Sequence, residues 1–313
     1  RHQSTALRKR KLRARRECDR LPSGGRDRTR AHVLLHAPLT QSTRYYLHRA
    51  RAYLGFALDR YRHPDAADFY SEINTTGYAP NAHIDALPEH RLIYVSVPKS
   101  ASTSIKMLLS HLIGRHPSPD QVHRRSLSGL PSPFEIGPAK FHRLVTDPAT
   151  LRFTFVRNPY DRLVSAWADK FQGRPLRPGN PFIDQYLALR PQVDPTLPGE
   201  GMDELDFADF VTYAAETAVC RLDAHWEVQD DIVAMPGLTY DLIGRVEPFD
   251  RAIVPVLDHI GADATLRRGA HIPLRTSARM SWQDYYTPGL ARRVRRAYER
   301  DFDRFGYRFA SFA

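Results

Sequence analysis

The sequence predicts an α/β protein in which helices flank a central parallel sheet. Twice along the chain, a short apolar strand leads through a brief polar turn into an amphipathic helix. The strand expected at 92–97 precedes a helix at 104–112, and the strand expected at 153–157 precedes a helix at 159–171. This order is typical of parallel sheets, which bind ligands at the carboxyl ends of their strands. We therefore expect the functional site at that edge of the sheet.

The first of these segments, LIYVSVPKSASTSIKMLL at 92–109, is suited to binding an anion. Its apolar alternation stops at Pro98, a hydroxyl-rich loop follows, and an apolar helical pattern begins at Ile105. Backbone amides at the start of such a helix bind anions, and Lys99 adds a compact positive charge. The loop is not an ATP-binding G-x-x-x-x-G-K-[ST] sequence, because it has no glycine between positions 93 and 113. An ordinary turn with a serine helix cap is the alternative.

The second segment, TFVRNPYDRLVSAWADKF at 154–171, offers another anion site on a neighbouring strand. Arg157 ends the strand, Asn158 is expected to cap the helix, and Pro159 suits the first helical position. Ser165 follows Arg157 by eight residues, about two helical turns, so both side chains can face one phosphate. The arginine would supply a bidentate fork and the serine a neutral hydrogen bond.

On its composition, the chain divides into three parts. Residues 1–40 form a basic arm that we expect to be disordered, residues 41–90 a helical extension, and residues 91–313 the main α/β domain. Residues 172–203 are rich in proline and glycine and are expected to form an insertion over the site. Further helices are expected at 42–62, 207–218, 247–260 and 288–304.

The charge balance favours acidic partners. The formal net charge is +11, from 46 basic and 35 acidic residues. Such a balance suits nucleotides, anionic polysaccharides or a membrane surface. Much of the excess lies in residues 1–30, which are Arg-rich with almost no hydrophobic spacing. We expect a solvated tail there rather than a nucleic-acid-binding arm.

The composition predicts a bacterial-type cytoplasmic protein. No run approaches the roughly 18–20 apolar residues of a membrane span, and no signal-peptide pattern is visible. Of the two cysteines, Cys18 lies in the arm, so we expect no structural disulfide with Cys220 and a reducing compartment. No cluster has the spacing of metal ligands, Asp223 with His225 being too sparse, so no metal is expected.

The two strand–turn–helix segments closely resemble those of the carbohydrate sulfotransferases, specifically the family 2 group of chondroitin- and HNK-1-type enzymes. VPKSASTSIK at 97–106 is similar to that group's 5′-phosphosulfate loop, and FVRNPYDRLVSAWADKF at 155–171 is similar to its 3′-phosphate segment. The resemblance covers residues 91–313, which would form the sulfotransferase domain. Three further stretches match: CRLDAHWEVQDDI at 220–232, YDLIGRVEPFDRAI at 240–253 and DYYTPGLARRVRRAYERDFDRFGY at 284–307.

The resemblance implies a P-loop-like three-layer fold and 3′-phosphoadenosine 5′-phosphosulfate (PAPS) as the sulfuryl donor. Lys99 would contact the phosphosulfate, and Arg157 and Ser165 would hold the 3′-phosphate. A loop closing on the nucleotide would contribute Arg275 and Ser277. The residues that would hold the 5′-phosphate are Ser100, Ala101, Ser102, Thr103 and Ser104.

Sulfuryl transfer to a hydroxyl needs a base for the acceptor proton, neutralisation of charge on the leaving phosphate, and in-line geometry. Lys99 and the loop amides would neutralise that charge. Members of the wider group use a histidine as the base. His142, in the stretch KFHRLV, is therefore the candidate base, and His123 in an Arg-flanked loop is the alternative.

The sequence thus predicts a PAPS-dependent sulfotransferase that acts on a hydroxyl, and the resemblance implies a carbohydrate acceptor. Two other interpretations stay open: a nucleotide-dependent phosphotransferase on a P-loop-like fold, and a non-catalytic protein that binds polyanions. The missing G-K-[ST] and the lack of an obvious magnesium carboxylate after a strand count against the phosphotransferase. Because Golgi relatives bear a transmembrane anchor, the Golgi lumen is the alternative location.

Overall fold

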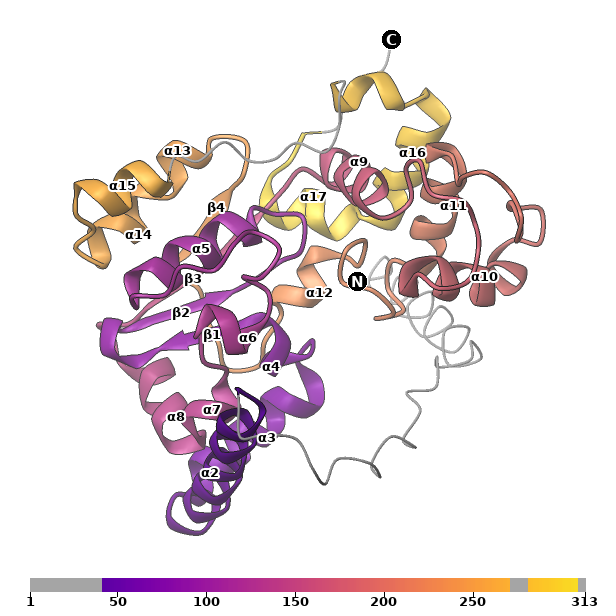
Figure 1. The fold of residues 1–313 in the computed structure, drawn as a ribbon. Coiled ribbons are helices and arrows are strands. Elements are labelled where there is room, and N and C mark those ends of the chain that lie inside the picture. The colour runs from indigo at the N-terminus through magenta and orange to yellow at the C-terminus, as the bar shows by residue number, and fades with distance from the viewer. Residues whose placement is uncertain (1–40, 271–280, 309–313) are drawn as a thin grey trace, which may run out of the picture. The chain divides into compact units, whose positions relative to one another are not determined.

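The computed structural model describes residues 41–270 and 281–308, which fall into two compact units (Figure 1). The first, here called the sheet unit, contains the described parts of 36–157 and 232–275. The second, the helical unit, contains 158–231 and the described part of 276–313. The expected division into an arm, an extension and a domain stays a prediction, and its arm lies outside the described residues.

The described sheet has four strands in the order β1-β2-β3-β4. β2, β3 and β4 are parallel, which confirms the predicted parallel arrangement. β1 is different, because it pairs antiparallel with β2, to which the short helix η1 (Pro88–His90) connects it. The strand–turn–helix pattern of the sequence did not predict this strand. The strands are β1 (Ile84–Leu87), β2 (Leu92–Val95), β3 (Leu151–Val156) and β4 (Leu242–Arg245).

Helices cover both faces of the sheet, as expected for three layers (Figure 1). Side chains alternate between the faces along each strand, so Tyr94 and Phe153 stack on one face with ring centroids 4.9 Å apart. The core on that face includes Ile105 and Leu109 of α5. Helices α5 (Ser102–Leu112), α13 (Phe249–Ala252), α14 (Val254–His259) and α15 (Ala264–Ala270) lie on this side. Helices α2 (Gln41–Arg62), α3 (Pro64–Thr76), α7 (Pro133–Ile136) and α8 (Pro138–Thr146) lie on the other.

The helical unit has a core rich in aromatic side chains. Trp226 is 1% exposed and contacts the rings of Phe171, Phe210 and Tyr213. The described helices of the helical unit are α9 (Pro159–Lys170), α10 (Pro181–Val193), α11 (Phe207–Thr217), η2 (Trp282–Tyr285), α16 (Pro288–Ala297) and α17 (Glu299–Phe305). The sheet unit also contains two short helices, α4 (Pro80–His83) and α6 (Arg125–Ser128). A further short helix, α12 (Gln229–Val233), begins in the helical unit and ends in the sheet unit.

Three predicted elements differ from the structure. The helix expected at 247–260 is two short helices, α13 and α14, and the one expected at 288–304 is interrupted at Tyr298 between α16 and α17. The insertion expected at 172–203 contains the helix α10. Asn180 caps that helix by accepting the Phe182 amide at 3.0 Å, a local signal that its proline-rich surroundings obscured.

A buried ion cluster joins the antiparallel strand to the helices beside it. Asp85, in the middle of β1, is fully buried. One carboxylate oxygen lies 2.5 Å from Lys106 Nζ of α5, and the other lies 2.7 Å from Arg125 Nη1 of α6. Lys106 is only 6% exposed, so its charge is compensated inside the protein rather than by water.

We expect Asp85→Asn to lower the free energy of unfolding by about 3–5 kcal/mol, because it leaves Lys106 buried without its counter-charge. Urea unfolding followed by circular dichroism measures this loss. Glu89→Gln is the matched control, since Glu89 pairs with Lys140 at 2.8 Å on the surface, and it should leave the urea midpoint unchanged. Equal midpoints for the two variants would contradict the assignment.

A second buried carboxyl group lies in the helical unit. Glu227 is fully buried, and burial raises its pKa well above its usual range, with the Arg162 and Arg221 charges opposing that shift. The Arg162 guanidinium donates to two backbone carbonyls, that of Glu227 at 2.6 Å and that of Ala224 at 2.5 Å. The folded protein therefore favours the protonated form of Glu227.

Stability of the helical unit should fall as the pH rises above the ordinary glutamate pKa of 4.5, because the raised pKa makes the folded state bind one more proton than the unfolded state. Urea unfolding between pH 5 and 8 should show this slope, and Glu227→Gln should flatten it by roughly 1 kcal/mol per pH unit. Glu216→Gln, at an exposed glutamate of α11, should keep the wild-type slope. Identical slopes in the wild type and Glu227→Gln would refute the prediction.

Candidate functional site

The loop after β2 turns sharply without glycine. Lys99 and Ala101 both have left-handed backbone angles, with φ of 66° and 59°. Other residues than glycine seldom adopt such angles, and each costs on the order of 1 kcal/mol or more, so surrounding contacts must hold them. Ser100, between them, is fully buried and donates its amide to the Val97 carbonyl at 3.2 Å. Packing contacts thus hold the loop in backbone angles that glycine usually adopts.

Backbone amides at the start of α5 precede the helical hydrogen-bond ladder. The Ile105 amide donates to the Ala101 carbonyl at 3.1 Å, and the amides of Ser102, Thr103 and Ser104 come before it. Such amides carry the partial positive charge of the helix N-terminus. This geometry suits the anion-binding role expected from the sequence, and the contact of each loop residue with a ligand stays a prediction.

The structure brings the two predicted anion segments together. β2 and β3 pair in parallel with Val95 opposite Thr154, whose hydroxyl donates to the Val95 carbonyl at 2.8 Å. Their carboxyl ends therefore meet at one edge of the sheet. Arg157, the first residue after β3, donates from Nη1 to the Lys99 carbonyl at 3.2 Å. Residues 58 positions apart are thus in direct contact at the predicted place.

Ser165 lies on α9 in the helical unit, where it is 5% exposed. The predicted start of α9 is confirmed, because Asn158 accepts the Tyr160 amide at 3.0 Å and Pro159 is the first helical residue. Arg157 belongs to the other unit, so a phosphate shared between Arg157 and Ser165 stays a prediction. Arg275 and Ser277 lie outside the described residues.

The two candidate histidines have different surroundings. His123 Nε2 lies 3.0 Å from Thr103 Oγ1, in the first turn of α5. His142 is on α8, where its ring meets the edge of Phe69 from α3 with centroids 5.0 Å apart. The structure therefore brings His123, the alternative, to the loop, while the role expected for His142 stays a prediction.

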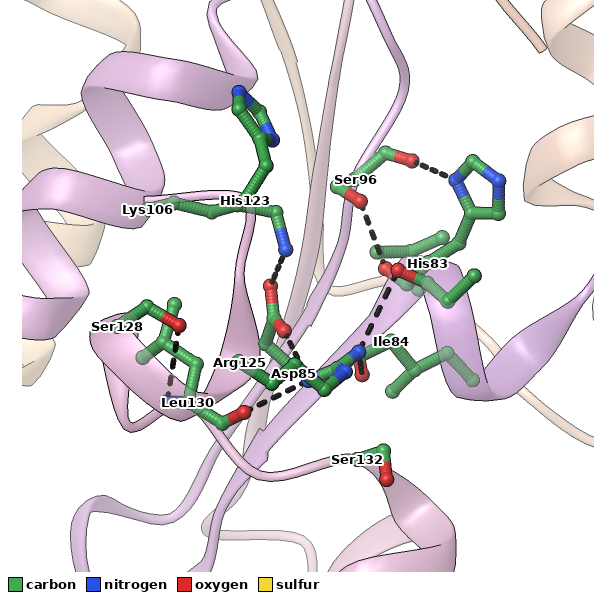
Figure 2. Close-up of polar contacts among 12 residues, drawn as sticks. His83, Ile84, Asp85, Ser96, Lys106, His123, Arg125, Ser128, Leu130 and Ser132 are labelled. Atoms are coloured by element: carbon green, nitrogen blue, oxygen red, sulfur yellow. Dashed lines mark hydrogen bonds and ion pairs between the residues drawn. The ribbon is translucent and has the colours of Figure 1, made fainter. Parts of the chain in front are cut away.

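The ion cluster of Asp85, Lys106 and Arg125 ties α5, the helix that follows the loop, to β1 and α6 (Figure 2). A second contact fixes the beginning of the loop: His83 Nδ1 lies 2.8 Å from the Ser96 carbonyl, and Ser96 Oγ donates to the His83 carbonyl at 3.1 Å. Sequence analysis missed these residues. The available signal was a single aspartate inside the apolar run IDAL at 84–87.

In the helical unit, Asp223 and His225 form a close pair. Asp223 Oδ1 lies 2.6 Å from His225 Nδ1 and accepts the His225 amide at 2.8 Å. The His225 ring also meets Phe182 with centroids 5.2 Å apart. Within the described residues, no group of three or more histidine, cysteine or acidic side chains is placed to hold a metal ion.

Comparison with known proteins identifies relatives over most of the chain. A sequence model of the sulfotransferase family matches residues 82–308. Carbohydrate sulfotransferase 10 of Gallus gallus is 27% identical, over 72% of this chain and 66% of the relative, and its Homo sapiens counterpart is 26% identical over the same shares. Carbohydrate sulfotransferase 11 of Mus musculus is 27% identical, over 59% of this chain and 54% of the relative. No solved structure is significantly similar.

The cytoplasmic location expected from the composition is wrong. The relatives are vertebrate carbohydrate sulfotransferases 10 and 11, which are Golgi membrane enzymes. The expectation that Cys18 and Cys220 form no disulfide stays a prediction, because Cys18 lies outside the described residues. Among the described residues, none of the helices combines the length and hydropathy of a transmembrane span.

The family match extends beyond the two anion segments. It begins at residue 82, two positions before β1, and ends within the last residues that the structure describes. It therefore includes the ion cluster, the loop, α9 and the pair of Asp223 and His225. The chain spans about two thirds of the length of the first relatives it matches. With the family model covering well over half of its residues, this chain belongs to the sulfotransferase family.

Proposed function

We propose that this chain is a PAPS-dependent sulfotransferase that transfers a sulfuryl group to a hydroxyl of a carbohydrate. The observation that carries the proposal is the contact of Arg157 with the Lys99 carbonyl at 3.2 Å, which joins two anion-binding segments at one sheet edge. Family membership supports sulfuryl chemistry. The names of the relatives, which are carbohydrate sulfotransferases, support a carbohydrate acceptor.

The loop is suited to the 5′-phosphosulfate of the donor. Its amides from Ser102 to Ser104 lie ahead of the helical ladder, and Lys99 brings a charge that can follow the sulfuryl group. Arg157 is suited to the 3′-phosphate, for which its guanidinium offers a planar fork, and Ser165 would add a hydroxyl. The donor site would therefore distinguish a 3′-phosphorylated nucleotide from an ordinary diphosphate.

The residues present can perform in-line transfer. Lys99 and the amides at the start of α5 stabilise the charge that develops on the leaving phosphate, a contribution on the order of 3 kcal/mol for each well-placed donor. The loop and the neighbouring strand end hold the donor while the acceptor hydroxyl attacks from the opposite side. The proton of that hydroxyl needs a base, for which the sequence offers two candidate histidines, His142 and His123.

Isothermal titration calorimetry with 3′-phosphoadenosine 5′-phosphate (PAP) and ADP tests the donor site. The wild type should prefer PAP, and Arg157→Ala should weaken PAP binding about 10- to 100-fold, because it removes charge-assisted hydrogen bonds to the 3′-phosphate. ADP binding should change little in the same variant. Arg143→Ala, at an exposed arginine of α8, is the control and should bind PAP as the wild type does.

Equal affinity of the wild type for ADP and PAP would favour the alternative interpretation, a nucleotide-dependent phosphotransferase. Loss of all nucleotide binding on raising the salt concentration, with no turnover of PAPS, would instead favour a polyanion-binding protein.

The loop itself can be tested by two substitutions two positions apart. Lys99→Ala should lower the rate of sulfuryl transfer about 100- to 1,000-fold, because it removes a charge that stabilises the leaving phosphate. Ala101→Gly should leave the rate and the PAP affinity within about threefold of the wild type, because glycine readily adopts the left-handed angle found there. Single-turnover release of PAP from PAPS gives both rates. A severe loss in Ala101→Gly, or none in Lys99→Ala, would contradict this view of the loop.

A further inference from the structure

We propose that His123 is the base that accepts the proton of the acceptor hydroxyl; this inference rests on the proposed sulfuryl transfer. His123 Nε2 lies 3.0 Å from the hydroxyl oxygen of Thr103. Thr103 is the second residue of α5, and its amide is among those that precede the helical ladder. An imidazole in contact with this turn is therefore close to whatever anion the amides bind.

The backbone on both sides of His123 is fixed by hydrogen bonds. Before it, the Val122 amide donates to the Ser118 carbonyl at 3.1 Å, and the Val122 side chain is 1% exposed. After it, the Arg124 amide donates to the Gln121 carbonyl at 2.8 Å. The segment that carries His123 is thus a hydrogen-bonded turn anchored by a buried side chain.

Arg125, two residues further on, locks this turn to the ion cluster (Figure 2). Its guanidinium donates to Asp85 Oδ1 at 2.7 Å and to the carbonyls of Leu130 and Ile84, both at 2.8 Å. Asp85 in turn holds Lys106, one helical turn after Thr103 on α5. A single buried carboxylate therefore sets the position of His123 and of the helix whose amides would bind the donor, which is the rigid support that a catalytic group requires.

His142 occupies a different place in the sheet unit. It lies on α8, which covers the face of the sheet opposite to α5 (Figure 1). Its ring packs against Phe69 of α3, with centroids 5.0 Å apart. Packing against a neighbouring helix is a common role for a half-buried histidine. The geometry therefore favours His123 over His142 as the base.

The acceptor oxygen forms a bond to the sulfur of PAPS while the bond between that sulfur and the 5′-phosphate oxygen breaks. The acceptor proton passes to a ring nitrogen of His123, and the electron pair of the broken bond stays on the phosphate of PAP. Lys99 and the amides of α5 stabilise the phosphate, and imidazole, which ordinarily titrates near neutral pH, suits the proton.

The test compares the variants His123→Ala, His123→Gln and His142→Ala with the wild type, all as the full chain. Single-turnover release of PAP from PAPS is measured with chemically desulfated chondroitin as acceptor, and in parallel with water alone as acceptor. PAP affinity is measured by calorimetry. We expect His123→Ala to lower the release rate about 100- to 10,000-fold in both series while PAP affinity stays within threefold. His142→Ala should stay within threefold on both measurements.

Added imidazole should raise the rate of PAP release by His123→Ala at least tenfold and leave that of His142→Ala unchanged. A purely structural role of His123 would not give this rescue. His123→Gln should remain as slow as His123→Ala. A near-wild-type rate in His123→Gln would show that the side chain only positions Thr103, and a loss confined to His142→Ala would assign the base there; either result overturns the inference. Failure of the wild type to bind PAP would instead overturn the proposed function, and this inference with it.

Discussion

The position of α5 and of the loop before it depends on one buried carboxylate. Asp85 lies in the antiparallel strand β1 and neutralises two cations, Lys106 from α5 and Arg125 from α6. Burying three charges is expensive, and such clusters add little net stability over apolar packing. They do select one arrangement strongly, because any other would leave a charge without its partner. In this protein the selected arrangement places the first turn of α5, the strand ends and the turn of His123 together.

The same arrangement explains a loop that turns without glycine. Nucleotide-binding loops rely on glycine to reach left-handed angles, whereas here Lys99 and Ala101 adopt them. The contacts that hold them come from several directions: Arg157 donates to the Lys99 carbonyl, and Ser96 exchanges hydrogen bonds with His83. A lysine at such an angle has its backbone fixed while its side chain stays long and mobile, which suits a charge that must follow a group during transfer.

Charge and composition were poor guides to where the protein works. The Arg-rich, cysteine-poor composition suggested a cytoplasmic protein, yet the relatives are Golgi enzymes. The reason is physical: net charge governs solubility and non-specific attraction to anions, and both act in the same way in any compartment. The residues expected to bind the donor are few and follow the ends of β2 and β3, which lie side by side in the sheet.

The parallel strands, the helices that follow them and the side chains at the strand ends could be predicted from the sequence. These features arise from short-range patterns: alternation along β2 and β3, the Asn158 cap and Pro159 at the start of α9. Three features became visible only in the folded chain: β1 joins the sheet, Asp85 pairs with Lys106 and Arg125, and His123 rather than His142 contacts Thr103. Those contacts join residues 20 to 40 positions apart. No local pattern encodes them, because their energy comes from pairing charges and polar groups that the folded core has already removed from water.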